Sequence, residues 1–209
     1  MRPNIVRGSG PERPRSWTGR TREVLAERLP MENLLPDRQP YYVGSWVYTF
    51  GVMTIAALIL TVLTGVILAI AGPEWWHISA AGRFFNSLHF WSVQVFFVFM
   101  VLHLWGQYFM ASWRGGRAPT WVIGVVIFAI SIAAAFTGYL SQQNFASQWI
   151  AVSAKDALNA TGLGAFFNVL NFGQMYGIHV ALLPAAIIAL VALHVIWVRL
   201  KGVVPPIEV

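Results

Sequence analysis

Four histidines lie within long hydrophobic stretches of the chain, at His89, His103, His179 and His194. The first two are fourteen residues apart and the last two fifteen. In a helix these separations correspond to ~21–22 Å along the axis and turn both side chains toward roughly the same side. Such a pair cannot bind one metal ion, but two helices of this kind can each give one imidazole to two separate centres. Because ionisable residues are costly at membrane depth, we interpret these four as functional.

The absence of cysteine narrows the chemistry of these centres. No cysteine occurs among the 209 residues, which excludes disulfides, cysteine-bound iron–sulfur clusters and thioether-linked haem. Paired imidazoles at two depths favour two haems, whose irons would carry electrons because no coordination position is left open. Any one histidine taken alone could instead be hydrogen-bonded to a carbonyl of a neighbouring helix. The fifth, His77, is predicted to be a surface side chain.

Four apolar segments, each long enough to cross a bilayer, position the histidines. We place them at 43–71, 84–112, 120–140 and 174–198, and none contains Asp, Glu, Lys or Arg. With 57% hydrophobic and 11% charged residues, the chain is predicted to be an all-α membrane protein, a bundle of four transmembrane helices enclosing two haems. One or two short surface helices are expected within 141–172.

The first forty residues differ in composition from the rest. Residues 1–20 are rich in Arg, Pro and Gly, and 21–29 are predicted to form a short interfacial helix, with an ordinary solvated helix as the alternative. We therefore divide the chain into a basic cytoplasmic tail, 1–40, and a four-helix diheme domain, 41–209.

The basic residues indicate the topology. Twelve of the fourteen lie before the first span, between the second and third, or after the fourth, and only Arg83 and Lys155 lie on the other side. The positive-inside rule therefore predicts cytoplasmic N- and C-termini. Because the basic residues are concentrated on one face of the membrane, no nucleic-acid partner is expected.

This topology decides how the histidines pair. The two histidine-bearing spans run in the same direction, so His89 pairs with His179 at the outer level and His103 with His194 at the cytoplasmic level.

Glycines in the other two spans repeat the fourteen-residue spacing. They are Gly51 and Gly65 in the first span and Gly124 and Gly138 in the third. A macrocycle needs close backbone approach, which glycine allows. By depth, Gly51 and Gly124 should flank the cytoplasmic haem, and Gly65 and Gly138 the outer one. Ordinary helix packing remains the alternative for any single glycine.

Seven motifs across residues 40–206 accompany these positions. They are LTVLTG (60–65), LHFW (88–91), LHLWGQYF (102–109), PTWVIG (119–124), FTGY (136–139), IHVALLP (178–184) and LHVIWVRLKG (193–202). As a set they resemble the cytochrome b family of bc and b/f complexes. The likeness is greatest to the short split form, the N-terminal four-helix half, because the second histidine pair is fifteen apart.

The resemblance implies a subunit of a quinol:cytochrome c oxidoreductase in a bacterial inner membrane, not active alone. Quinol would be oxidised at the outer side, and electrons would pass through a low-potential outer haem b and a high-potential inner one, coupled to proton translocation. It also implies a C-terminal cytochrome b fragment, a Rieske iron–sulfur protein and a cytochrome c subunit as partners, in a homodimeric complex.

Two arginines acquire roles from the resemblance. Arg117 would bind a propionate of the inner haem, as a guanidinium binds carboxylates well, and Arg199 would border the inner quinone pocket. The alternative is that both are interfacial anchors that serve topology alone.

The chain also departs from the family pattern near the outer haem. Where the family has arginine three residues before the first histidine, this chain has Asn86, and Arg83 one turn earlier is expected to substitute. After FTGY, the family's Leu-Pro-Trp is replaced by a stretch containing Gln142, Gln143 and Asn144, so we expect an altered outer quinol pocket. Thr49 replaces the cysteine that tethers an extra haem in b/f forms.

The Pro-Glu-Trp-Trp sequence at 73–76 resembles a motif that the family carries in the other half of the protein. It is interpreted here as a turn with membrane-belt tryptophans.

The rival functions are a diheme membrane anchor that links a hydrogenase or other dehydrogenase to the quinone pool, and a non-redox anchor with structural histidines.

Overall fold

A computed structural model of the protein describes residues 17–29 and 45–204. The chain divides into two units, Met1–Gln39 and Pro40–Val209, which are described separately.

The first unit contains α1, which spans Trp17–Arg28. The helix predicted at 21–29 is therefore present and begins four residues earlier. Trp17, Val24 and Leu25 are exposed on it, but its place in the membrane interface stays a prediction.

The second unit contains four helices long and apolar enough to cross a membrane. They are α3 (Trp46–Ala71), α5 (Ala80–Phe109), α6 (Ala118–Leu140) and a fourth span, Phe172–Lys201, made of α8 (Phe172–Gly177), η3 (Ile178–Leu182) and α9 (Leu183–Lys201). No strand occurs within the described ranges. These observations confirm the predicted all-α fold with four spanning helices.

Local signals explain where α5 begins and ends. It starts four residues before the predicted bound because the Ser79 hydroxyl accepts a hydrogen bond from Gly82 N at 2.8 Å, satisfying a free donor of the first turn. It ends at Phe109, after which the chain turns through Gly115 and Gly116, whose φ angles are +64° and +79°. Positive φ angles favour glycine, so the turn lies where the sequence has two glycines.

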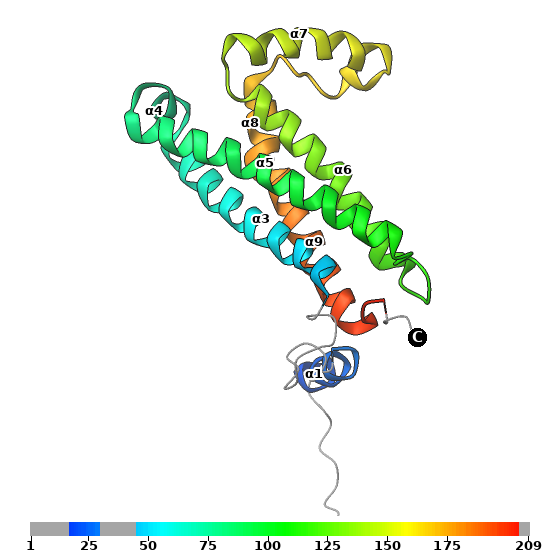
Figure 1. Ribbon diagram of the computed structural model, residues 1–209. Coiled ribbons are helices and arrows are strands. Elements are labelled where there is room, and N and C mark those ends of the chain that lie inside the picture. Colours follow the sequence, from blue (N-terminus) through cyan, green and yellow to red (C-terminus); the bar gives the residue numbers. More distant parts are fainter. Residues whose placement is uncertain (1–16, 30–44, 205–209) are drawn as a thin grey trace, which may run out of the picture. The chain divides into compact units, whose positions relative to one another are not determined.

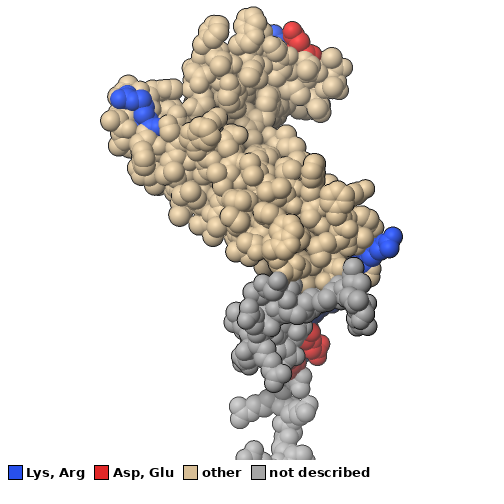
Figure 2. All heavy atoms as spheres, in the orientation of Figure 1, with Lys and Arg blue, Asp and Glu red and all other residues tan. Residues whose placement is uncertain are grey.

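The four spans pack as two pairs, α3 against α5 and α6 against α9 (Figure 1). Each pair combines a glycine-bearing helix with a histidine-bearing one. Most large apolar side chains on their outer surfaces are exposed, and the charged side chains seen on one face of this unit lie toward its two ends and not over its middle (Figure 2). Helices that are apolar all round are typical of membrane spans.

Two surface helices, α4 (Pro73–Ile78) and α7 (Phe145–Ala160), lie at one end of the spans, here called the outer end after the predicted topology. The opposite end, with the α5–α6 turn, is the inner end. A cluster built on Leu140, Ala151 and Met175 packs α7 over the ends of α6 and α8. A 3-10 turn, η2 (Leu163–Ala165), follows α7, so the short surface helices expected between the third and fourth spans are confirmed.

The α4 helix corrects the interpretation of residues 73–76 as a turn. Pro73 occupies its first turn, where a missing N–H is tolerated. Trp76 is only 5% exposed, so this side chain faces the bundle interior and does not act as a belt tryptophan. His77 is exposed, as predicted.

The fourth span is interrupted by a π-helical turn at η3, which contains His179. Leu183 N donates to Ile178 O, five residues earlier. A π turn accommodates one extra residue in an α-helix, and Pro184, which lacks an N–H and crowds the preceding turn, follows at once. The extra residue lets His179 and His194, fifteen residues apart, face nearly the same directions as two residues fourteen apart in a regular α-helix.

Candidate metal centres

The imidazoles of His89 on α5 and His179 in η3 lie close together at the outer level. Their ring centroids are 6.2 Å apart and their planes are at 82°. Imidazole nitrogens bind metal ions at ~2.0–2.1 Å, so two rings on opposite sides of one ion have centroids roughly 6 Å apart. The structure therefore brings the predicted outer pair to a separation that suits one metal ion.

Hydrogen bonds determine which nitrogen of each outer ring is free for a metal. Nδ1 of His89 lies 3.0 Å from Thr61 O, and Nδ1 of His179 lies 2.9 Å from Ala134 O. A carbonyl oxygen only accepts, so Nδ1 carries the hydrogen in each neutral ring and Nε2 has the lone pair. Such bonds orient metal-binding histidines and raise their basicity.

A glycine follows each of these carbonyls by four residues. Gly65 follows Thr61, and a Cβ atom there would lie 3.1 Å from Cε1 of His89. Gly138 follows Ala134, and its Cβ would lie 2.8 Å from Nε2 of His179. Because residues four apart share one face of a helix, a side chain at the glycine would block the approach to the carbonyl. These glycines therefore let the helix backbone bind an imidazole.

The inner end repeats this arrangement once in full. Nδ1 of His194 lies 3.1 Å from Thr120 O, and Gly124 follows Thr120 by four residues. A Cβ on Gly124 would lie 3.4 Å from Cε1 of His194. His194 is therefore oriented in the same way as the outer histidines, with a looser glycine contact.

His103 differs in one respect from the other three. A Cβ on Gly51 would lie 3.1 Å from its Cε1 atom, so the glycine contact is present. Its buried Nδ1 has no hydrogen-bond partner among the described residues. His103 and His194 lie near enough to interact electrostatically. Each glycine thus contacts the histidine of the level predicted for it.

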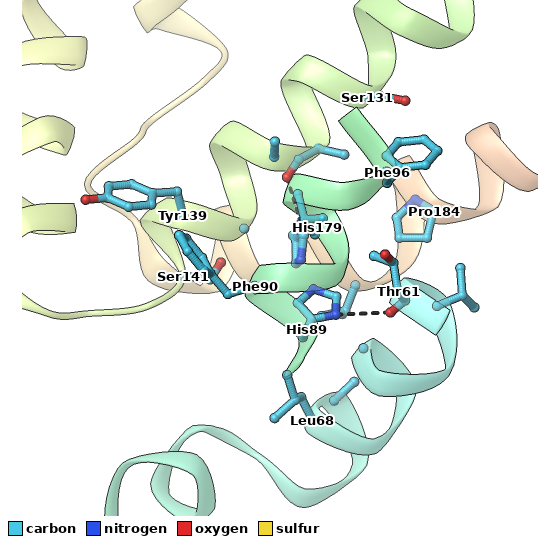
Figure 3. Close-up of a pocket in the computed structure, with 18 of the residues that line it drawn as sticks. Thr61, Leu68, His89, Phe90, Phe96, Ser131, Tyr139, Ser141, His179 and Pro184 are labelled. Carbon is cyan, nitrogen blue, oxygen red and sulfur yellow. Dashed lines mark hydrogen bonds between the residues drawn. The ribbon is translucent and has the colours of Figure 1, made fainter. Parts of the chain in front are cut away.

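A cavity of about 420 Å³ surrounds the outer histidines. All four spans contribute to its mainly apolar wall, which includes Gly65 and Gly138, and Figure 3 shows His89 and His179 as neighbours within it. Its size falls in the range of ~300–1,000 Å³ usual for cofactor sites.

These features fit a haem. Within the two described ranges, no three His, Cys, Asp or Glu side chains gather as a metal site, so two imidazoles alone would leave an ion under-coordinated. A haem would supply the remaining ligands, and His89 and His179 would hold its iron. The donor set, the ring spacing and the cavity therefore agree with this cofactor.

A pair of side-chain amides, Asn86 on α5 and Gln142 after α6, lies in the wall of the outer cavity. Asn86 Nδ2 donates to Gln142 Oε1 at 3.0 Å, and Gln142 Nε2 donates to Asn86 Oδ1 at 2.9 Å. Each amide keeps one more N–H to donate. The two departures from the family pattern thus form one uncharged contact.

Arg83 lies apart from this pair. Its side chain is exposed and donates to Ile78 O at 3.1 Å and His77 O at 3.4 Å. It caps the end of α4 and is not among the residues that line the outer cavity.

Three buried side-chain polar atoms toward the inner end have no hydrogen-bond partner among the described residues. They are Arg117 Nε, Thr120 Oγ1 and Trp121 Nε1, at or near the start of α6. Unsatisfied buried donors are costly, so Arg117 Nε is available to a ligand carboxylate. Arg199, half-buried in the last turn of α9, is the other predicted inner residue.

A protein-family model identifies the family of this chain. The family model described as cytochrome b(N-terminal)/b6/petB matches residues 94–208, which include His103, His179 and His194. The chain belongs to this cytochrome b family.

Curated cytochrome b proteins align over most of the chain. Cytochrome b6 of Heliobacterium modesticaldum is 27% identical, and the alignment covers 87% of this chain and 98% of the relative. The menaquinol:cytochrome c reductase cytochrome b subunit of Bacillus subtilis is 26% identical, with 89% and 92% covered.

A solved structure titled "Hyperthermophilic respiratory Complex III" shares the fold of this cytochrome b. The TM-score is 0.64 at 18% identity, over 88% of this chain. The chain spans about half of that longer one, since 53% is covered.

Two residues near the outer histidines of this cytochrome b were not predicted from the sequence. One is Trp76, which lines the outer cavity from α4. The other is Thr64, whose Oγ1 atom lies 3.1 Å from Nδ1 of His89. A signal for the second was present, because Thr-Gly occurs at both 64–65 and 137–138.

Proposed function

We propose that this chain is the cytochrome b subunit of a bc-type quinol:cytochrome c oxidoreductase and carries electrons across the membrane through two b-type haems. One observation supports this most strongly: histidines that contact glycines occur at two depths of a single four-helix bundle. A bis-imidazole haem supplies a one-electron centre with no open coordination position.

Different residues of this chain would bind the haems at the outer and inner levels. His89 and His179 hold the outer haem, and His103 and His194 hold the inner one. The carbonyls of Thr61, Ala134 and Thr120 keep three rings in orientation, and the apolar wall excludes water from the outer centre. Arg117 would bind an inner carboxylate, and Arg199 would border the inner quinone pocket.

Membership of a larger complex belongs to the same proposal. The Bacillus subtilis relative is named as a subunit of a menaquinol:cytochrome c reductase, which supports a quinol as the electron donor. Proton translocation as the coupled process is part of the same proposal. The partners would be a C-terminal cytochrome b fragment, a Rieske protein and a cytochrome c subunit, in a homodimeric complex. The site would be a bacterial inner membrane, with both termini cytoplasmic.

Haem content tests the two-haem proposal directly. A pyridine haemochrome assay of the purified complex should find two b-type haems per chain. His103→Ala should remove one of them, because it deletes an axial ligand. The control is His77→Ala, which changes an exposed histidine and should leave both. One haem or none in the unmodified complex, or two in His103→Ala, would contradict the proposal.

The composition of the complex distinguishes it from the rival anchor function. Co-purification with a Rieske protein and a cytochrome c supports the bc-type assignment. Co-purification with a catalytic dehydrogenase or hydrogenase subunit, without a Rieske protein, would overturn it in favour of the anchor.

A further inference from the structure

The two levels differ in the number of acceptors that their histidine Nδ1 atoms have. At the outer level, His89 has two, a backbone carbonyl at 3.0 Å and the Thr64 hydroxyl at 3.1 Å, and His179 has one. At the inner level, His194 has one, and His103 has none among the described residues. The outer imidazoles are therefore the more strongly hydrogen-bonded pair.

The Thr64 hydroxyl is fixed as an acceptor. Its Oγ1 atom lies 2.8 Å from Leu60 O and 3.0 Å from Thr61 O, both of which only accept. A hydroxyl has one hydrogen, which these carbonyls take, so only its lone pairs face His89. Thr64 is 2% exposed, so water does not compete for this contact.

Thr137 occupies the equivalent place on α6 without the same contact. It precedes Gly138 as Thr64 precedes Gly65, is 1% exposed, and bonds Ala133 O and Ala134 O at 3.0 Å each. The described contacts of its hydroxyl do not include His179. The repeated Thr-Gly sequence therefore supplies a matched position whose hydroxyl has no described bond to a histidine.

We propose that Thr64 lowers the redox potential of the outer haem, the low-potential centre that the family resemblance implies, by sharing with Thr61 O the single hydrogen of His89 Nδ1. This inference rests on the proposed function, because it needs a haem at both levels.

The direction follows from the chemistry of the ring. An acceptor on Nδ1–H shifts electron density toward Nε2 and makes the imidazole a stronger donor. A stronger axial donor favours the oxidised over the reduced iron, and hydrogen bonding of this kind is an established control on haem potential. Removing one acceptor from His89 Nδ1 should therefore raise the potential of the outer haem.

The test is a redox titration of the purified complex, followed at the haem absorbance bands. Thr64→Val removes the hydroxyl and keeps the shape, so it should raise the lower-potential wave. The equilibrium should change by about threefold to tenfold, which is about 30 to 59 mV for one electron. Thr64→Ser keeps the acceptor and should titrate as the unmodified protein. Thr137→Val, the matched control, should move neither wave.

The outcomes separate this inference from the proposed function. Fewer than two haems per chain in the unmodified complex would refute the function itself. Two haems whose waves stay in place in Thr64→Val would refute only the inference. Equal shifts in Thr64→Val and Thr137→Val, or movement of the higher-potential wave alone, would do the same. If Thr64→Val does not assemble, Thr64→Ala removes the same hydroxyl and is titrated in the same way. If neither variant assembles but Thr64→Ser assembles normally, the hydroxyl has a structural role, and the inference is overturned.

Discussion

A Cβ atom on Gly138 would lie 2.8 Å from Nε2 and 2.9 Å from Nδ1 of His179. The imidazole therefore occupies the space that any other residue at 138 would need. The two residues come from different helices, α6 and η3, so the contact also fixes how closely these helices approach.

We predict that Gly138→Ala displaces His179 and reduces the outer haem content by more than half, because the methyl group overlaps the ring. Gly124→Ala should be milder, since its Cβ would lie 3.4 Å from His194. The control is Gly177→Ala, in the same span as His179, where no described atom beyond the neighbouring backbone lies within 4 Å of the added Cβ. There alanine should be neutral or slightly stabilising. The measurement is haem per chain in the purified variants, and equal loss in all three would contradict the steric explanation.

The Asn86–Gln142 amide pair predicts energetic coupling between α5 and the loop after α6. Asn86→Ala and Gln142→Ala should each lower the temperature at which the outer haem is released, and the double variant should lose little more than either one. Residues in direct contact show interaction energies of about 0.5–3 kcal/mol. Gln148→Ala, at an exposed side chain that bonds only a backbone oxygen at 3.3 Å, is the control. Additive effects in the double variant would show that the two amides act independently.

Much of this arrangement could be predicted from sequence because it depends on side-chain type and on helix geometry. Hydropathy located the four spans, and a regular rise per residue placed each glycine at the depth of the histidine it contacts. The contact partners of the glycines were less predictable. That they flank a macrocycle stays a prediction, and the contacts of Gly65 and Gly138 with imidazoles were not predicted.

The remaining features depend on the backbone, which leaves little trace in residue types. The acceptors of Nδ1 are mainly carbonyl oxygens, which every residue has, so nothing at Ala134 marks it as a partner of His179. The burial of Trp76 depends on how α4 folds back over the bundle, because a tryptophan near a helix end is equally compatible with the membrane interface.

Arg117 is predicted to raise the potential of the inner haem, on the proposed function, because a cation favours the reduced iron. Arg117→Gln should lower that potential, and a tenfold change in the equilibrium corresponds to about 59 mV for one electron. Arg117→Lys should keep most of the effect. Arg114→Gln removes the same charge from an exposed side chain in the same turn, where water screens it, and should change the potential much less. Redox titration of the three variants measures this, and equal shifts at both positions would point to general surface charge.

The π turn at η3 predicts that the fourth span tolerates a deletion that α5 does not. Deleting Leu182 removes one residue from the π turn, so the turn can close as an ordinary α turn. His179 and His194 would then be fourteen residues apart, as His89 and His103 are in the continuous α5.

Deleting Val95 from α5 is the matched control, because both residues are exposed and apolar, at 63% and 44%. α5 has no extra residue to give up, so this deletion turns His89 by about 100° relative to His103. Haem content should stay at two per chain without Leu182 and fall without Val95. Equal loss in both would show that the π turn does not set the histidine register.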